Sequence, residues 1–408
     1  MAQRPMEGVR ILEVAQFTYT PAAGAVLADW GADVIKVEHA VTGDAQRGMR
    51  GLSGWKENNF HPIIEHPNRG KRSVGLALEH PAALEVLYEL ARTSDVFLTN
   101  FLPDARTRLK IEVDDIRAVN PQIIYVRGSA FGVRGPEATR GGYDATAYWA
   151  RTGAAVGVRP PDYDGLIGMP APAYGDSLGG MTIAGGIAAA LFSRDRTGEP
   201  SVVDVSLLSV GLWASGLAVD ISLANGEPWP GGAMGNPPEA MTNPLAGPVK
   251  TADGRYIYLA MMQPGRYWAD FCRHIGREDL IDDERWNTAE KLIENAPSAG
   301  AVVHEVIGSK PYAYWVERFR TLEGQWAPVQ DSLELGNDPQ IRANGLIAEI
   351  TDADGTAREL VANPVQFDEQ PAVLNRGPLF AEHTYEVLRE LGRTEEEIIN
   401  LKIEGAVT

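Results

Sequence analysis

The sequence predicts an α/β protein with a parallel central sheet, and three observations support this fold class. Residues 9–14 have the apolar composition of a strand, residues 20–30 that of a helix, and residues 33–38 that of a second strand. A helix that connects two neighbouring strands makes them parallel. Further strand and helix patterns continue to residue 223, and a length of 408 residues allows one large domain or two.

The remaining elements follow in chain order. Residues 43–72 are polar and irregular, and strands are then expected at 73–78, 95–100, 123–128 and 202–205, with helices at 80–92, 141–153, 176–192 and 206–223. The glycine- and proline-rich stretch 226–248 predicts a linker or a loop over a site. A smaller α+β unit follows, with a strand at 256–260 and helices at 267–275, 289–294, 299–307 and 312–322.

The last part of the chain is expected to return to the large domain. It has a hairpin pattern at 347–361 and helix patterns at 382–391 and 395–401. The predicted division is therefore a large α/β domain from residues 1–225 and 331–408, with a linker and a small domain at 226–330.

Composition and charge exclude several classes of function. A net charge of −18 argues against a nucleic-acid partner, which needs a basic surface. The first residues lack an apolar signal segment and no apolar run reaches about 18 residues, so neither secretion nor a membrane span is expected. The single cysteine, Cys272, lies in an apolar helical pattern typical of a buried thiol, and the seven histidines show no metal-ligand spacing. These features predict a cytoplasmic protein without a metal site.

The stretch Tyr174–Gly180 leads into a helix built largely from glycine and alanine, and it holds the main candidate for chemistry. A helix with so little side chain packs close to its neighbours, so it is expected to be central. Asp176 has two interpretations. It is either a cap that accepts the free N–H groups of the first turn, or a carboxylate nucleophile that the helix dipole keeps ionised for attack on a carbonyl.

A second candidate region follows the predicted strand at 95–100. Asn100–Pro103 precede Arg106 and Arg108, and ligands of open α/β sheets lie beyond the carboxyl ends of the strands. Phe101 offers an apolar surface and an arginine offers a phosphate contact, so the pattern indicates a nucleotide site. The first strand–helix connection, Gln16–Pro21, lacks a Gly-x-Gly-x-x-Gly loop, so an ordinary dinucleotide-binding fold is not expected.

A series of short motifs runs along nearly the whole chain. They are Leu12–Val14 with Leu27–Glu38, Asn68–Ser73, Asn100–Pro103, Gly175-Asp176, Thr251–Arg255, Asp338–Gln340 and Glu382–Thr384. In this order they resemble the class III CoA-transferases, which include formyl-CoA and L-carnitine CoA-transferases and share their fold with α-methylacyl-CoA racemases. The resemblance implies a large domain with a six-stranded parallel sheet formed from both chain ends. It also implies a smaller inserted α+β domain and an interlocked homodimer.

The resemblance gives roles to individual residues. It makes Asp176 the catalytic nucleophile, which attacks an acyl-CoA thioester, passes through a mixed anhydride and an aspartyl-CoA thioester, and transfers CoA to an acceptor carboxylate. The CoA thioester is itself the substrate, so no tightly bound cofactor is expected, and the partners are an acyl-CoA, a carboxylic acid and a second copy of the chain. The implied CoA contacts are Thr18, His39, Leu76, Ala77, Leu78, Asn100, Phe101, Leu102, Arg108, Tyr143 and Asp144.

Two positions change the expected phosphate contacts. Lysines that contact CoA in the relatives fall here on Glu79 and Gly141. We therefore expect the phosphates to be held by other cations, with Lys71, Arg72 and Arg106 as candidates.

Other departures bear on the reaction. Formyl-CoA transferases have a glutamine at the position of Thr18 and a glycine-rich loop at the position of Gly235–Glu239, so oxalate and formate specificity is not expected. Racemases have a histidine at the position of Tyr143, whose phenol has a reference pKa near 10 and is a poor base at pH 7. The sequence thus predicts a CoA-transferase, and the alternatives are an acyl-CoA racemase or isomerase of the same fold and a CoA-binding protein without turnover.

Overall fold

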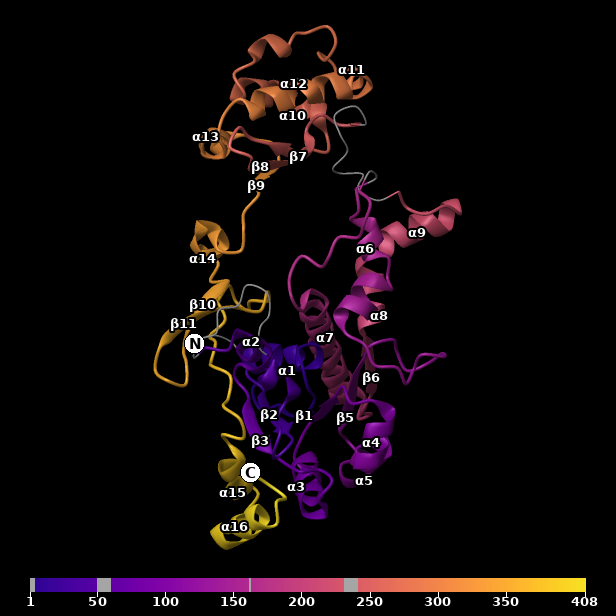
Figure 1. Cartoon of the computed structure of the whole chain (residues 1–408), viewed down its shortest axis with the longest axis vertical. Helices are drawn as coiled ribbons and strands as arrows, with labels where there is room; N and C mark the ends of the chain where they lie inside the picture. Colours follow the sequence, from indigo (N-terminus) through magenta and orange to yellow (C-terminus); the bar gives the residue numbers. More distant parts are fainter. Residues whose placement is uncertain (1–3, 50–59, 161–162, 231–240) are drawn as a thin grey trace. The chain divides into compact units, whose positions relative to one another are not determined.

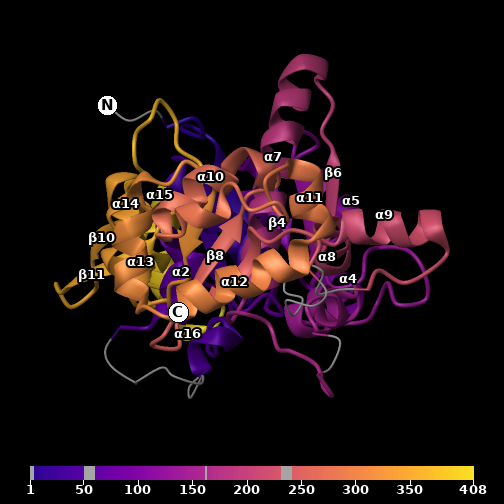
Figure 2. The same cartoon turned by 90° about the horizontal axis from the view of Figure 1, so that it is seen from above.

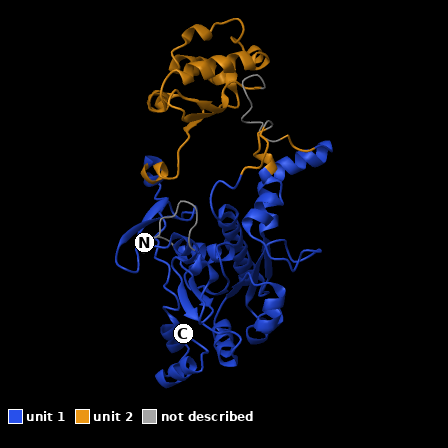
Figure 3. Cartoon of the chain, in the orientation of Figure 1, with its two compact units in different colours: residues 1–155, 168–227, 338–408 blue, residues 156–167, 228–337 orange. Residues whose placement is uncertain are grey.

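The chain forms two compact units. The computed structural model describes residues 4–49, 60–160, 163–230 and 241–408. One unit contains residues 1–155, 168–227 and 338–408, and the other contains residues 156–167 and 228–337 (Figure 3). The sequence-based division counted residues 156–167 and 331–337 in the large domain, whereas they belong to the second compact unit, and residues 226 and 227 belong to the first.

The large unit is built on a six-stranded parallel sheet in the order β3-β2-β1-β4-β5-β6 (Figure 1). This is the order of doubly wound nucleotide-binding folds, in which the connections reverse direction between β1 and β4. All six strands come from the first half of the chain: β1 (Arg10–Val14), β2 (Asp33–Glu38), β3 (Arg72–Gly75), β4 (Val96–Thr99), β5 (Ile124–Ser129) and β6 (Val202–Ser206). The six strand positions expected from sequence are therefore confirmed.

Helices cover both faces of this sheet. Successive strand residues point to opposite sides, and apolar residues on both sides must be buried. Ile11 packs on one face with α1 (Tyr19–Asp29) and α7 (Tyr174–Thr197). Leu12 packs on the other face with α3 (Pro81–Arg92) and α5 (Val113–Val119). The other helices described up to residue 225 are a 3-10 helix, η1 (Ala45–Gly48), α2 (Pro62–Asn68), α4 (Pro103–Leu109), a π-helical turn, η2 (Ala145–Ala150), α6 (Ala154–Gly157), α8 (Leu207–Ala214) and α9 (Gly216–Asn225).

The C-terminal segment joins the large unit through helices rather than strands. Buried residues of α15 (Thr384–Glu390) and α16 (Glu395–Ile403) pack in the core on the α3 side of the sheet. One isolated bridge, between Leu76 and Val407, connects this segment to the end of β3. Both chain ends thus belong to the large unit, but in the described residues the expectation that both contribute strands to its sheet is wrong. The helix α14 (Pro339–Ala343) and the hairpin of β10 (Ile347–Thr351) and β11 (Ala357–Val361) precede these helices.

The second unit is a small α+β domain with its own core. Its antiparallel sheet has the order β7-β8-β9, formed by β7 (Ala246–Lys250), β8 (Tyr256–Ala260) and β9 (Trp326–Pro328). Buried aromatic side chains, among them Trp286 and Trp315, fill the space between the sheet and its helices. These helices are α10 (Pro264–His274), α11 (Ala289–Glu294), α12 (Ala296–Gly308) and α13 (Tyr312–Arg318). Cys272 is buried in this core, as expected.

Two local predictions need correction. The helix expected at 206–223 is broken at Ser215 into α8 and α9, which meet at 70°. Both views show α9 standing away from the sheet, and none of its residues is buried (Figure 1, Figure 2).

In the described ranges no single helix is long and apolar enough to cross a membrane, and only the bent pair of α8 and α9 reaches that length jointly. The stretch 43–72, expected to be irregular, contains the helix α2.

Candidate active site

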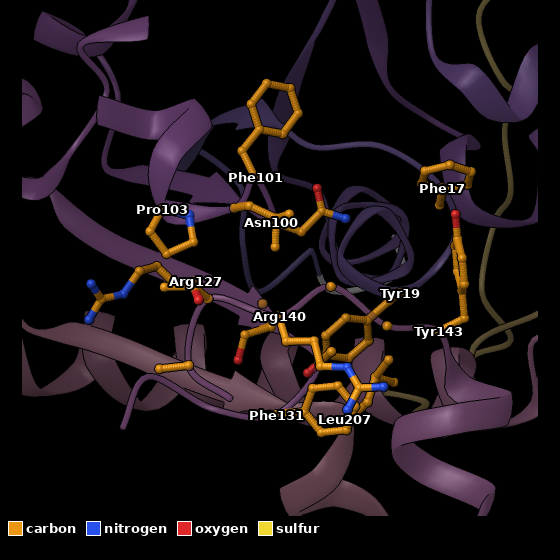
Figure 4. A pocket seen from close by; sticks show the side chains of 18 of the residues that line it. Phe17, Tyr19, Asn100, Phe101, Pro103, Arg127, Phe131, Arg140, Tyr143 and Leu207 are labelled. Atoms are coloured by element: carbon orange, nitrogen blue, oxygen red, sulfur yellow. The ribbon is translucent and has the colours of Figure 1, made fainter. Parts of the chain in front are cut away.

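A cavity of about 860 Å³ opens at the carboxyl ends of β1, β4 and β5, within the large unit (Figure 4). Residues after β1 and β4 form part of its wall, and these two strands flank the point where the connections reverse. Ligands of doubly wound sheets bind at this point. The lining residues are Gln16, Phe17, Tyr19, Asn100–Pro103, Ala105, Arg106, Arg127–Phe131, Val133, Ala138–Tyr143, Thr146, Asp176 and Leu207.

The connection between β1 and α1 is held in a fixed conformation. The side chain of Asn100 accepts a hydrogen bond from the N–H of Gln16 at 3.0 Å and donates one to the carbonyl of Gln16 at 2.7 Å. Phe17 has a φ of 64°, a left-handed conformation that costs free energy for a bulky side chain. Its N–H donates to Asp44 at 3.1 Å, and its ring meets Tyr143 edge-on at a centroid distance of 5.5 Å. These contacts shape the cavity wall before any ligand arrives.

Asp176 lies in the first turn of α7 and borders the cavity. The residue before the helix is Ala173, which adopts a left-handed conformation with a φ of 56°, so Asp176 is the third helical residue and not the cap that one interpretation expected. Among the described residues, no side chain or backbone group forms a hydrogen bond or an ion pair with its carboxylate. Burial, assisted by the nearby charge of Asp144, raises the pKa of Asp176 from 3.8 to about 7.

The first turn of α7 can reach the cavity because the residues of α7 that face α1 and η2 include glycines, which have no side chain. A Cβ atom added to Gly180 would lie 2.5 Å from the Cβ atom of Ala22, and one added to Gly175 would lie 2.5 Å from the ring of Tyr148. Both distances are impossible for real side chains, so the glycines allow α7 to pack against α1 and η2. The small-residue pattern in the sequence therefore did indicate a closely packed helix.

Asp144 is the second carboxylate of the site and begins the π-helical turn η2. Its Oδ1 accepts a hydrogen bond from the N–H of Ala145 at 2.8 Å, and its Oδ2 is buried without a hydrogen-bond partner in the described chain. Burial raises the pKa of Asp144, although the N–H groups of Gly175 and Asp176 act on the carboxylate and lower it in part. Asp176, which lines the cavity, thus has a second carboxylate with a raised pKa as a close neighbour.

The predicted site residues fall into three groups. Asn100, Phe101, Leu102 and Tyr143 line the cavity, and Asp144 adjoins Asp176. Thr18 lies between two lining residues but is buried, and its hydroxyl accepts a hydrogen bond from Gln46 at 2.8 Å. Arg108 is exposed near the end of α4 and forms no ion pair with another described residue.

The third group follows two other strands of the same sheet. His39 comes directly after β2, and Leu76, Ala77 and Leu78 come directly after β3. The N–H of Ala40 donates to the carbonyl of Leu76 at 3.3 Å, which brings these two segments together. Leu76 and Leu78 are buried in the core, whereas His39 is partly exposed and lies 3.9 Å from Glu79.

The structure gives Lys71 and Arg72 other roles than the phosphate contacts expected of them. The ammonium of Lys71 is buried and donates to both carboxylate oxygens of Glu13, at 2.8 and 2.7 Å, and to the carbonyl of Pro21. Arg72 is held by the carboxylates of Asp33, Glu386 and Glu390. Both cations already have anionic partners within the fold, so neither is assigned to CoA.

Sequence reasoning missed several lining residues. Arg127 and Arg140 line the cavity but pair with Asp204 and Glu137. Arg106, a candidate from sequence, also lines it, and its guanidinium binds Glu112 and the carbonyl of Phe101. The signal that could have found them was position, since Arg127 lies in the second half of β5 and Ala130 and Phe131 follow the carboxyl end of this strand. The loop expected at Gly235–Glu239 lies outside the described residues.

Comparisons with known proteins identify the family of the chain. The model of CoA-transferase family III matches residues 6–384. The chain is 30% identical to the (R)-2-hydroxy-4-methylpentanoate CoA-transferase of Clostridioides difficile, over 97% of this chain and 98% of the relative. It is also 30% identical to the cinnamoyl-CoA:phenyllactate CoA-transferase of Clostridium sporogenes, over 97% of this chain and 95% of the relative. A solved structure of a CAIB/BAIF family protein from Brucella suis superposes with a TM-score of 0.79 at 25% identity, covering 96% of this chain and 100% of that one.

The chain therefore belongs to CoA-transferase family III. It is an enzyme that transfers CoA between an acyl-CoA and a carboxylic acid, and a CoA thioester is its substrate.

Proposed function

We propose that this CoA-transferase works through a covalent intermediate on Asp176. The observation that carries the proposal is a half-buried carboxylate without a bonding partner in the described chain, at the start of α7 and on the wall of a cavity large enough for an acyl group and part of CoA. Because it forms no hydrogen bond with a described residue, the ionised carboxylate, which predominates above its pKa of about 7, keeps its lone pairs free for attack on a carbonyl.

The reaction follows from this placement. Asp176 attacks the thioester carbonyl, a C–O bond forms, the C–S bond breaks, and CoA leaves as a thiolate. The thiolate then attacks the aspartyl carbonyl of the mixed anhydride, which releases the donor acid and leaves CoA bound to Asp176 as a thioester. An acceptor carboxylate reverses both steps. Each step exchanges one activated acyl bond for another, so the energy of the thioester is retained.

The CoA portion is proposed to bind along the carboxyl edge of the sheet. Asn100, Phe101, Leu102 and Tyr143 line the cavity and would contact the part of CoA nearest to the thioester. Thr18 underlies the wall, while His39 and Leu76–Leu78 follow the neighbouring strands β2 and β3 and would contact the nucleotide. Arg108 is proposed as a phosphate contact, because it is exposed and unpaired among the described residues.

We further propose a cytoplasmic homodimer. Exposed apolar side chains gather on α8 and α9, with Trp213 exposed at 88% and Leu217 at 76%. Monomeric proteins seldom expose such large side chains together, so a partner surface is expected over them. The interlocked arrangement of the two copies rests on the family resemblance alone.

The covalent step can be tested directly. Purified protein is incubated with each member of a panel of acyl-CoA donors, without acceptor, and digested. A hydroxylamine-sensitive CoA adduct is expected on the peptide that contains Asp176. The panel should include thioesters of the acids named for the two clostridial relatives. Asp176→Ala should form no adduct and transfer no CoA, and a variant that keeps most of the transferase activity would remove Asp176 from the mechanism.

A further inference from the structure

The hydroxyl of Tyr19 is a buried polar group of the cavity that the reaction outlined above does not use. Tyr19 begins α1 and lines the cavity, and only 6% of the residue is exposed (Figure 4). Its hydroxyl oxygen is buried and has no hydrogen-bond partner in the part of the chain that the structure describes. An unsatisfied buried hydroxyl costs free energy, so such a group is rarely kept without a ligand to bind.

The ring is held from both edges next to this hydroxyl. A Cβ atom on Gly179 of α7 would lie 2.2 Å from Tyr19 Cε2, and one on Gly128 of β5 would lie 3.1 Å from Tyr19 Cε1. The backbone of Gly179 and that of Gly128 therefore pack against Cε2 and Cε1 of Tyr19, the two ring carbons next to the carbon that carries the hydroxyl. The ring has little freedom to turn its hydroxyl to another partner.

The other hydroxyl groups of the cavity differ from that of Tyr19. Ser129 accepts a hydrogen bond from Gly132, and Thr146 donates one to the carbonyl of Tyr143. Thr139 and Tyr143 are exposed and can bind water. Among the described lining residues, Tyr19 is thus the one whose hydroxyl is both buried and without a partner.

The position of Tyr19 relative to Asp176 suits a hydrogen-bond donor. The two side chains are close enough for the Asp176 charge to add to burial in raising the pKa of Tyr19, so the phenol keeps its proton. The negative charge that develops on the acyl oxygen needs a hydrogen-bond donor in the cavity, and the Tyr19 hydroxyl has no other partner among the described residues.

On the basis of the proposed covalent mechanism, we propose that the Tyr19 hydroxyl donates a hydrogen bond to the acyl oxygen while Asp176 attacks the thioester carbonyl. As the C–O bond to Asp176 forms, the carbonyl electron pair moves onto this oxygen, and it returns when the C–S bond breaks and CoA leaves as a thiolate. Tyr19 keeps its proton throughout and forms no covalent bond. It is a catalytic residue because it touches the reacting oxygen.

The test is Tyr19→Phe, which removes one oxygen and keeps the ring between its two glycines. Single-turnover formation of the CoA adduct on the Asp176 peptide should slow by on the order of 100-fold, as expected for the loss of one oxyanion donor. The calorimetric Kd for free CoA, which has no acyl group to transfer, should stay within about twofold, and the thermal midpoint should not fall. The matched control is Tyr88→Phe, which removes a hydroxyl bonded to the carbonyl of Lys110, away from the lining residues, and should leave the rate unchanged.

The outcomes separate this inference from the proposed function. Absence of an adduct in the parent protein with every donor would overturn the covalent mechanism and the inference with it. A normal adduct in the parent protein with an equal rate in Tyr19→Phe would overturn the role of Tyr19 alone. A slow Tyr19→Phe variant whose thermal midpoint also falls would assign Tyr19 to packing and overturn the donor role.

Discussion

The raised pKa of Asp176 predicts that replacing this residue by asparagine stabilises the protein above neutral pH. In the unfolded chain the carboxyl group ionises near 3.8, whereas in the folded protein burial and Asp144 hold it protonated up to about 7. The folded state therefore binds more protons than the unfolded state between these two values, and stability is lost as the pH rises through this window. Above about pH 7 both states are ionised, and the folded protein carries the full cost of the charge.

The size of the effect follows from the two pKa values. One pH unit corresponds to 1.36 kcal/mol, so the difference between 3.8 and about 7 is worth about 4 kcal/mol at most. Asparagine has nearly the same shape and no charge. Asp176→Asn should therefore raise the free energy of unfolding by about 3 kcal/mol at pH 6 and by about 4 kcal/mol at pH 8.5, while abolishing CoA transfer.

Urea denaturation at one fixed protein concentration measures this difference across the pH range. The fixed concentration matters, because association of subunits would add to the apparent stability. Asp282→Asn is the control, since Asp282 is exposed and its replacement should change stability by no more than about 0.5 kcal/mol. An Asp176→Asn variant that is less stable than the parent at pH 8.5, or a difference that does not change with pH, would refute the reasoning.

Four further predictions concern binding, chemistry and assembly. Lys71→Met should lower the free energy of unfolding by on the order of 3 kcal/mol, because buried Glu13 loses the closer of its two lysine partners and keeps only Lys36, and calorimetry on the folded variant should show unchanged CoA affinity. Arg108→Ala should weaken acyl-CoA binding by on the order of 1.5–3 kcal/mol, and an unchanged calorimetric Kd would remove it from the site. A 2-methylacyl-CoA in deuterated water should show negligible α-deuteration by mass spectrometry, because Tyr143 is a poor base at pH 7, and rapid exchange without an adduct would favour a racemase. Sedimentation at nanomolar concentration should show only a dimer, and a compact species of 44.2 kDa would contradict it.

Local patterns were sufficient to predict the sheet but not the partners of its charged residues. Each strand of the large unit has the apolar composition of a buried parallel strand, so the six positions could be found from short windows. The pairing of Lys71 with Glu13 joins residues 58 positions apart, and no local pattern contains it. Lys71 and Arg72 were therefore candidates for phosphate contacts, although in the fold they bind carboxylates from β1, β2 and α15.

The break between α8 and α9 shows a similar limit. Residues 206–223 are largely apolar, with interruptions by serines and Asp220, and the sequence pattern predicted one continuous helix. In the structure α8 packs into the core through Leu207 and Val210, whereas α9 buries none of its residues. The turn at Ser215 thus marks the place where contact with the core ends, which depends on tertiary structure and not on the composition of the run.

The position of the glycines explains how a doubly wound sheet without a phosphate-binding loop places the carboxylate of Asp176 at its ligand site. In dinucleotide-binding folds, glycines in the first strand–helix turn let the ligand approach the helix N-terminus. Here Phe17, Thr18 and Tyr19 occupy that turn and fill the space. The glycines lie instead in α7, where they let this helix approach α1 so closely that its first turn reaches the same cavity. The group presented at the switch point is therefore the side chain of Asp176 rather than a row of backbone N–H groups, which suits a covalent transfer reaction better than the binding of a pyrophosphate.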